Sequence, residues 1–135
     1  MIDVTLTRIV LRDNSHQQYI YLTEVEGQRS FQIVIGNNEA DEIHRVVHGQ
    51  ASKRPFTHQL AYSAIKGLGA RIQAVEIIDL KENTYYARLL LADAMDQRLE
   101  LDARPSDAIA LAMRARCAIR VDEEVMERAT RTSDG

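Results

Sequence analysis

Polar side chains that could carry acid–base or phosphate chemistry gather in one short stretch of the chain. It holds two carboxylates, Asp102 and Asp107, with Arg104 and Ser106 between them. Pro105 predicts the start of a helix, because the first helical position needs no backbone N–H donor. These groups therefore lie at a helix N-terminus, where free N–H groups favour anions. Two interpretations stay open: Asp107 complements the helix dipole, or the four side chains converge on an anion or metal site.

Glu39 is a second carboxylate in an unusual position, at the start of a helix predicted from about residue 39 to residue 48. On a helical wheel it falls between Ile43 and Val46, inside the apolar face. It is either solvated in a frayed first turn or partly buried and paired. Burial would raise its pKa, and a helix N-terminus or an arginine would lower it. Both functional sites and structural ion pairs show such opposed effects.

A third helix start follows the same pattern as the one at Arg104, with Arg-Pro and then a hydroxyl residue. Here Arg54 precedes Pro55, and Thr57 is the expected N-cap of a helix running to about residue 66. Phe56 is expected to pack on the first turn of that helix. His58 falls in this turn, where it either has no special role or takes part in proton transfer near neutral pH.

Segments of alternating and β-branched apolar residues predict the strands that must position these helix starts. The fold class is α+β, with a mixed, largely antiparallel sheet and three to four helices in a single compact domain over residues 1–129. Residues 130–135 are expected to form a frayed C-terminal tail. The predicted strands are 2–12 (with a phase slip after Leu6), two hairpins at 19–35 and 70–92, 97–102 and 118–121, and the helices are 39–48, 57–66, 105–113 and 123–129.

Composition favours a cytoplasmic globular protein without a membrane association. The 135 residues contain no apolar run approaching the roughly 20 residues that span a bilayer, and the N-terminus lacks signal-peptide character. Cys117 is the single cysteine, which excludes an intrachain disulfide and suits a reducing compartment. The net charge of −3 means that a nucleic-acid role would need a local basic face. The candidates for that face are Lys53, Arg54, Arg104, Arg114 and Arg116.

Five segments, in their order and spacing, resemble the bifunctional nuclease domain family. The most specific is the Arg-Pro-Ser-Asp-Ala-Ile core at 104–109, within the segment 102–112. The other four are Ile35–Ala40, Arg54–Leu60, Tyr85–Leu89 and Ile119–Val125. The resemblance implies a compact domain that self-associates and hydrolyses both DNA and RNA. It also implies a homo-oligomer, most simply a dimer, for which the apolar strand at 85–91 is an expected interface.

The motif positions carry over residue by residue as candidate site residues. The catalytic candidates are Glu39, His58, Asp102 and Asp107; the substrate-binding candidates are Arg54, Arg104 and Ser106; and the metal-binding candidates are Glu39, Asp102 and Asp107. Such carboxylates suit a divalent cation, Mg²⁺ or Mn²⁺, and no organic cofactor is expected. We expect Glu39, Arg54, Arg104 and Asp107 to share one pocket. The alternative is a non-catalytic oligomeric binding or regulatory module, in which the same charges form salt bridges.

Overall fold

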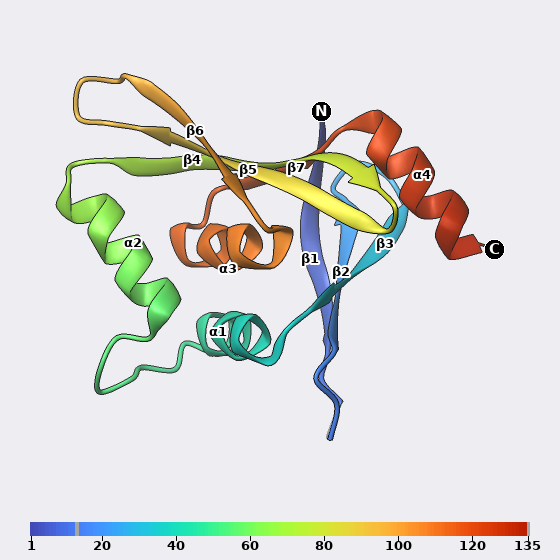
Figure 1. The fold of residues 1–135 in the computed structure, drawn as a ribbon, viewed down its shortest axis with the longest axis horizontal. Helices are drawn as coiled ribbons and strands as arrows, with labels where there is room; N and C mark the ends of the chain where they lie inside the picture. The colour runs from blue at the N-terminus through green and yellow to red at the C-terminus, as the bar shows by residue number, and fades with distance from the viewer. Residues whose placement is uncertain (13, 135) are drawn as a thin grey trace.

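A computed structural model describes residues 1–12 and 14–134, which form four helices and seven strands (Figure 1). The helices are α1 (Asn37–Val47), α2 (Thr57–Gly67), α3 (Pro105–Ala115) and α4 (Glu123–Asp134). The strands are β1 (Ile2–Val10), β2 (Gln18–Glu24), β3 (Ser30–Ile35), β4 (Arg71–Lys81), β5 (Thr84–Ala92), β6 (Arg98–Ala103) and β7 (Ala118–Val121). The expected α+β class with a mixed, largely antiparallel sheet is confirmed.

All seven strands belong to one sheet in the order β3-β2-β1-β7-β4-β5-β6. Every neighbouring pair is antiparallel except β4 and β7, which run parallel. The sheet is strongly curled: the rings of Phe31 on β3 and Tyr85 on β5 pack with centroids 5.6 Å apart, although four strands lie between β3 and β5 in the sheet. This curl brings the end of β3, which leads into α1, close to the start of β5.

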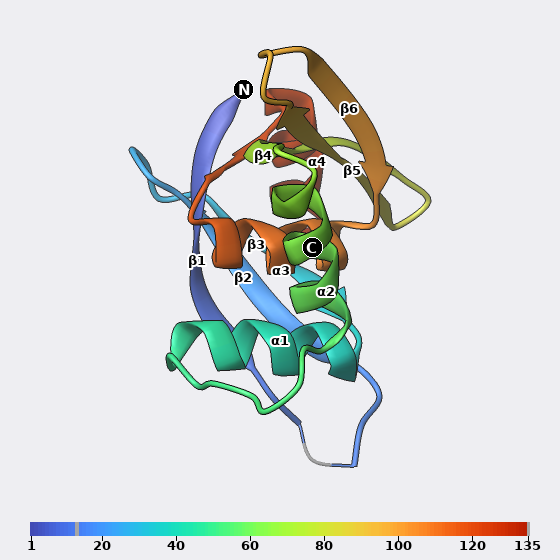
Figure 2. The ribbon, with the colours of Figure 1, turned by 90° about the vertical axis from the view of Figure 1, so that its left-hand side faces the viewer.

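Helix α3 fills the inside of the curled sheet and is the core of the molecule. Its residues 108–112 are almost completely buried. It packs on β4 and β5 on one side, and α1 and α2 contact its other faces (Figures 1 and 2). Helix α4 lies at the other end of the molecule from α2, against β3 and β4 (Figure 1). The N-termini of α1, α2 and α3 can therefore meet around one central helix.

Three details of the predicted elements needed correction. Helix α1 begins at Asn37, after the N-cap Gly36 and two residues before the expected start, and α2 begins after the N-cap Phe56, so Thr57 is not its capping residue. In α2 the backbone N–H of the N-cap residue Phe56 has a partner within the helix: it donates a hydrogen bond to Gln59 Oε1 at 2.7 Å. Helix α4 continues to Asp134, beyond the end expected at residue 129. The phase slip in β1 is confirmed as a register shift between Leu6 and Arg8.

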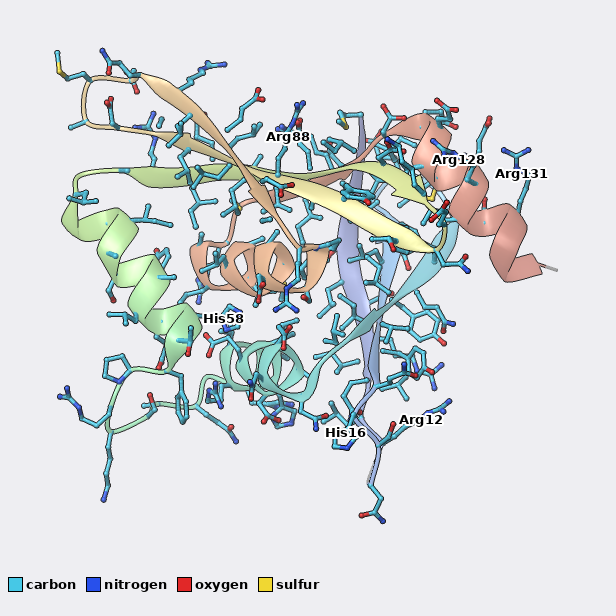
Figure 3. The ribbon with its side chains drawn as sticks, in the orientation of Figure 1. Arg12, His16, His58, Arg88, Arg128 and Arg131 are labelled. Atoms are coloured by element: carbon cyan, nitrogen blue, oxygen red, sulfur yellow. The ribbon has the colours of Figure 1, made fainter. Side chains whose placement is uncertain are left out.

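The open face of the sheet carries a row of alternating charges across five strands. Arg120 on β7 lies between Asp3 at 3.4 Å and Glu76 at 3.8 Å. Arg88 on β5, which projects on the side of the sheet away from α3 (Figure 3), pairs with Glu76 at 2.7 Å and Glu100 at 3.3 Å. Both arginines belong to segments that carry the family resemblance. Their position assigns them to a structural ion-pair network, away from the helix starts.

A buried carboxylate joins α1 to α3 on the inner side. Glu42 is fully buried, and its oxygens accept hydrogen bonds from Arg114 Nε at 2.8 Å and Arg45 Nη2 at 2.9 Å. Arg114 Nη2 also contacts this carboxylate. Arg114, one of the expected members of a basic face, therefore has its charge offset by Glu42.

Within the described chain, no helix is long and apolar enough to cross a membrane.

Glu42→Gln should lower the free energy of unfolding by about 3 kcal/mol, because removing one partner of a buried ion pair leaves the other charges uncompensated. The matched control is Glu100→Gln, whose carboxylate pairs with Arg88 but is 62% exposed. An exposed pair of this kind contributes less than about 1 kcal/mol. Urea denaturation of both variants measures the difference. Equal, small losses in the two variants would contradict the structural role of Glu42.

Candidate functional site

The N-terminal turns of α1, α2 and α3 bring candidate side chains from distant parts of the sequence into contact. Glu39 comes from α1, His58 from α2, and Arg104 and Asp107 from the start of α3. Figure 3 shows His58 projecting from α2 toward the other two helices. Because α3 lies between α1 and α2, its N-terminus is the natural meeting point. The site is thus a consequence of how the three helices pack.

Glu39 is buried and paired, which decides between its two interpretations. Its side chain is 8% exposed, and Oε1 accepts hydrogen bonds from Arg104 Nη2 at 2.9 Å and Ser106 Oγ at 3.2 Å. Gly36 makes room for this carboxylate, since a Cβ at that position would lie 3.0 Å from Glu39 Oε2. Ser106 was expected to bind substrate, but its hydroxyl donates a hydrogen bond to the Glu39 carboxylate. The two groups fix the carboxylate against the start of α3.

Arg104 and Asp107 extend the same network toward α2. Arg104 Nε donates to Asp107 Oδ2 at 2.9 Å, and Asp107 Oδ1 lies 2.9 Å from His58 Nε2. The Arg104 side chain is 71% exposed, and its Nη1 donates to no other described residue. One guanidinium is therefore held by two carboxylates while an edge of it stays open to solvent.

The ionisation of Asp107 determines which nitrogen of His58 carries a proton. Partial burial opposes ionisation of Asp107, but hydrogen bonds from Arg104 and His58 outweigh it and lower the pKa of this carboxyl below its usual value. The hydrogen bond between Asp107 and Arg104 also raises the pKa of Arg104. An ionised carboxylate only accepts hydrogen bonds, so His58 Nε2 must be the donor. In neutral His58 the lone pair is then on Nδ1, which is available to accept a proton.

Two hollows adjoin this network and share Glu39 and Arg104. The first has a volume of about 470 Å³, and its charged or aromatic lining includes Arg45, Phe56, His58 and Asp107. The second has a volume of about 380 Å³ and lies between β3, the β4–β5 turn and the start of α3, next to Ser106 and Tyr85. Both volumes fall in the roughly 300–1,000 Å³ range of small-ligand sites. Arg104 therefore faces space on both sides.

The structure does not bring two of the candidate residues into this site. Arg54 is exposed in the segment between α1 and α2 and lines neither hollow. Asp102 is exposed on β6, opposite Arg88 in the strand pairing, and lines neither hollow. Three of the four residues expected to share a pocket, Glu39, Arg104 and Asp107, do share one. Arg54 was assigned on a sequence motif, and its position next to a helix N-cap does not aim it inward.

The three expected metal ligands do not form a cation site in this arrangement. In the part of the chain that the structure describes, no group of three or more His, Cys, Asp or Glu side chains is placed to hold a metal ion. Asp102 lies apart, and both oxygens of Asp107 already accept hydrogen bonds. Glu39 Oε1 receives two donors as well. The residues present therefore fit an anion-binding guanidinium better than a three-carboxylate cation site.

Phe56 is a site residue that the sequence pattern did not identify as one. Its ring is 50% exposed and lines the first hollow, and the Arg45 guanidinium lies 4.0 Å from its centroid. It was expected to pack on α2 as a hydrophobic staple. The usable signal was its place in the segment Arg54–Leu60, two residues before His58.

The strand at 85–91, the expected interface, lies in the interior of the sheet. It belongs to β5, which is hydrogen-bonded on both edges, to β4 and to β6. Leu89 and Leu91 are buried in the core. An apolar strand in the interior of a sheet has no free edge, so a second copy cannot extend the sheet through this strand.

Comparisons with known proteins agree with the position of these motifs. The family model of the bifunctional nuclease domain matches residues 20–134. An uncharacterised protein of Mycobacterium tuberculosis H37Rv, Rv1829, is 36% identical over 127 residues, which cover 94% of this chain and 75% of the relative. Bifunctional nuclease 1 of Oryza sativa subsp. indica is 30% identical over 74 residues, which cover 53% of this chain and 22% of the rice protein.

Asp107→Asn should remove a pH-dependent part of the stability. The folded-state pKa of Asp107 is lowered, so the stabilisation is present above the ordinary Asp pKa of about 3.9 and is lost as the pH falls through the lower folded value. At pH 7 the wild type should be more stable by roughly 1 kcal/mol. Thermal unfolding between pH 7 and pH 3 checks this, and the gap between the two proteins should narrow as the pH falls below about 4. A gap that stays constant would contradict the assignment.

Proposed function

The chain belongs to the bifunctional nuclease domain family, and on that basis we propose that it hydrolyses phosphodiester bonds of DNA and RNA. The observation that carries the proposal is the His58–Asp107–Arg104 arrangement at the first hollow. It combines a histidine oriented by a carboxylate with an exposed guanidinium on the same carboxylate. The name of the rice relative, a bifunctional nuclease, supports the same reaction class.

In the proposed reaction, His58 is the general base and Arg104 binds the phosphate. Arg104 stabilises the charge on the phosphoryl oxygens through its exposed edge, as guanidinium groups do in phosphate sites. His58 Nδ1 accepts a proton from a water molecule as the water oxygen bonds to phosphorus. The phosphorus–oxygen bond to the leaving group then breaks, and the leaving oxygen takes a proton from the His58 imidazolium or from solvent. Asp107 orients the imidazole and stabilises its charged form.

Glu39 has a positioning role in this scheme. It is buried and holds the Nη2 side of Arg104, while Asp107 holds Nε. The two carboxylates fix the guanidinium plane, so the free edge points to one place. Ser106 in turn fixes Glu39. This pre-organisation avoids reordering a long side chain in the transition state.

A divalent cation, Mg²⁺ or Mn²⁺, remains part of the proposal as an expectation from the resemblance. None of the roles proposed for His58, Arg104 and Asp107 involves this cation, because the expected ligands do not converge. When bound, such a cation would supply charge neutralisation at the phosphate. Cleavage assays with chelator and with each metal determine whether the reaction depends on it.

A non-catalytic binding or regulatory module is the second candidate, and one observation favours it. Arg104 is paired with two carboxylates, so the network is close to charge-neutral or negative before any ligand binds. Such a network could hold α1, α2 and α3 together without any reaction. The cleavage assay below distinguishes the two functions.

We also propose that the chain forms a homodimer, with β6 rather than β5 at the interface. β6 is an edge strand of the sheet, and its Leu99 and Leu101 are 54% and 39% exposed. Exposed apolar residues on an unpaired edge favour pairing with another chain. Light scattering should return about twice the 15.3 kDa of the chain. A monomer mass across micromolar concentrations would contradict this part of the proposal.

Asp107→Asn and His58→Gln should each lower the cleavage rate by roughly 10²-fold or more, as the loss of a general base or of its orienting group does. The substrates are single- and double-stranded DNA and RNA, assayed with and without Mg²⁺ or Mn²⁺. Asp3→Asn is the matched control, because it removes an exposed carboxylate on the open face of the sheet. It should cleave like the wild type.

Each variant should melt close to the wild type, so that lost cleavage reports on chemistry. Equal cleavage by the wild type, Asp107→Asn and His58→Gln would contradict the mechanism. Absence of cleavage by the wild type on every substrate and metal would contradict the nuclease function and favour the binding module. Asp102→Asn, assayed in parallel, tests the residue that sequence similarity assigns and the geometry leaves out.

A further inference from the structure

Phe56 presents an exposed aromatic ring that is held in place from behind. Phe56, the N-cap residue of α2, is half exposed, so much of its apolar surface remains in contact with water. The Arg45 guanidinium covers one of its faces at 4.0 Å. Arg45 is in turn tied to Glu42 at 2.9 Å, and Glu42 is fully buried. Arg45 therefore holds the ring in place at the wall of the 470 Å³ hollow, which Phe56 lines.

Phe56 shares the 470 Å³ hollow with the proposed catalytic residues. His58 follows it by two positions in α2, and Arg104 and Asp107 line the same space. The hollow thus has an aromatic part and a guanidinium part. A nucleotide has the same two parts, a flat base and a phosphate, and the hollow falls within the size range of small-ligand sites.

The charges around the hollow determine which part of a nucleotide lies where. Asp41, an exposed carboxylate on α1, lines the hollow together with Asn38. A phosphate is repelled by Asp41, whereas an uncharged base can donate hydrogen bonds to it from its exocyclic groups. Arg45, the other guanidinium that lines the hollow, is already paired with the buried Glu42. The phosphate therefore belongs at Arg104, and the base belongs at the ring of Phe56.

We propose that Phe56 is a base-stacking platform and that the substrate is a single-stranded nucleic acid with one nucleotide seated in this hollow. The inference rests on the proposed function, since it uses the same hollow. In a duplex both faces of each base are already stacked, so only an unpaired or extruded base can lie on Phe56. Stacking on an aromatic side chain tolerates every base, which fits a chain that would act on both DNA and RNA.

The test measures binding of a short fluorescent single strand with phosphorothioate linkages, which resist hydrolysis. Phe56→Ala should bind it roughly 5- to 150-fold more weakly than the wild type, the range found for the loss of one base–aromatic stack. Phe56→Leu keeps apolar volume without a ring and should lose binding similarly. Phe56→Tyr keeps the ring and should bind like the wild type. A duplex of the same sequence should bind the wild type more weakly than the single strand does.

An abasic strand of the same length separates stacking from general effects. The wild type should lose affinity for it by about the same factor as Phe56→Ala loses for the normal strand. Phe56→Ala should bind the normal and the abasic strand equally. Melting curves of the three variants show that each is folded, as expected for a half-exposed position.

The outcomes distinguish this inference from the proposed function. Binding that depends on Phe56, with no cleavage of ordinary strands, supports the platform and contradicts the nuclease. Cleavage by the wild type with equal binding by wild type and Phe56→Ala overturns the platform and leaves the nuclease. Stronger binding of the duplex overturns the single-strand assignment, and no binding of any strand at low salt overturns both proposals.

Discussion

The ion pair between Glu39 and Arg104 is the interaction on which the site depends. Glu39 is buried, and a buried carboxylate is tolerated only when hydrogen bonds and an opposite charge compensate for its lost hydration. Arg104 and Ser106 supply that compensation from the start of α3. The pair therefore sets how α1 meets α3, and it keeps Arg104 at the wall between two hollows.

The position of α3 makes this interaction possible. A helix that is buried on most of its surface must be surrounded, and the curled sheet together with α1 and α2 surrounds it. The N-terminus of α3 is the end of this helix that bonds to both α1 and α2. Unsatisfied N–H groups, Arg104 and Asp107 are all found there. Fold and site thus share one cause, which is the packing of one apolar helix whose first turn carries polar side chains.

Much of the fold could be predicted from the sequence, because the strands show clear alternation and the helix starts contain Pro and hydroxyl residues. The shift after Leu6 in β1 was visible as a break in that alternation. The N-cap of α2 was misplaced by one residue and the start of α1 by two, since Gly36 is required by the space that Glu39 occupies and Phe56 by contacts outside its own helix. These requirements come from tertiary packing, which a local pattern does not contain.

The site was predicted only in part, again because tertiary packing decides which polar side chains meet. Glu39 stood out because it fell in an apolar arc, and it proved to be paired. Asp102 was assigned from its place just before a helix start and from the motif, and Arg54 from the motif; neither lines the hollows. Glu42 lies three residues after Glu39 on the same side of α1, so its burial could have been anticipated. The role of Phe56 in the site could not be predicted, because Arg45, which holds its ring, comes from another helix.

The most direct test of the central claim is which ring nitrogen of neutral His58 carries the proton, measured by long-range ¹H–¹⁵N NMR. The chain has four histidines, and His58→Gln identifies the signal of interest. An ionised Asp107 that accepts from Nε2 predicts the Nε2–H form, with an unprotonated Nδ1, and predicts that Asp107→Asn changes this pattern. An Nδ1–H form in the wild type, or a pattern unaffected by Asp107→Asn, would contradict the account.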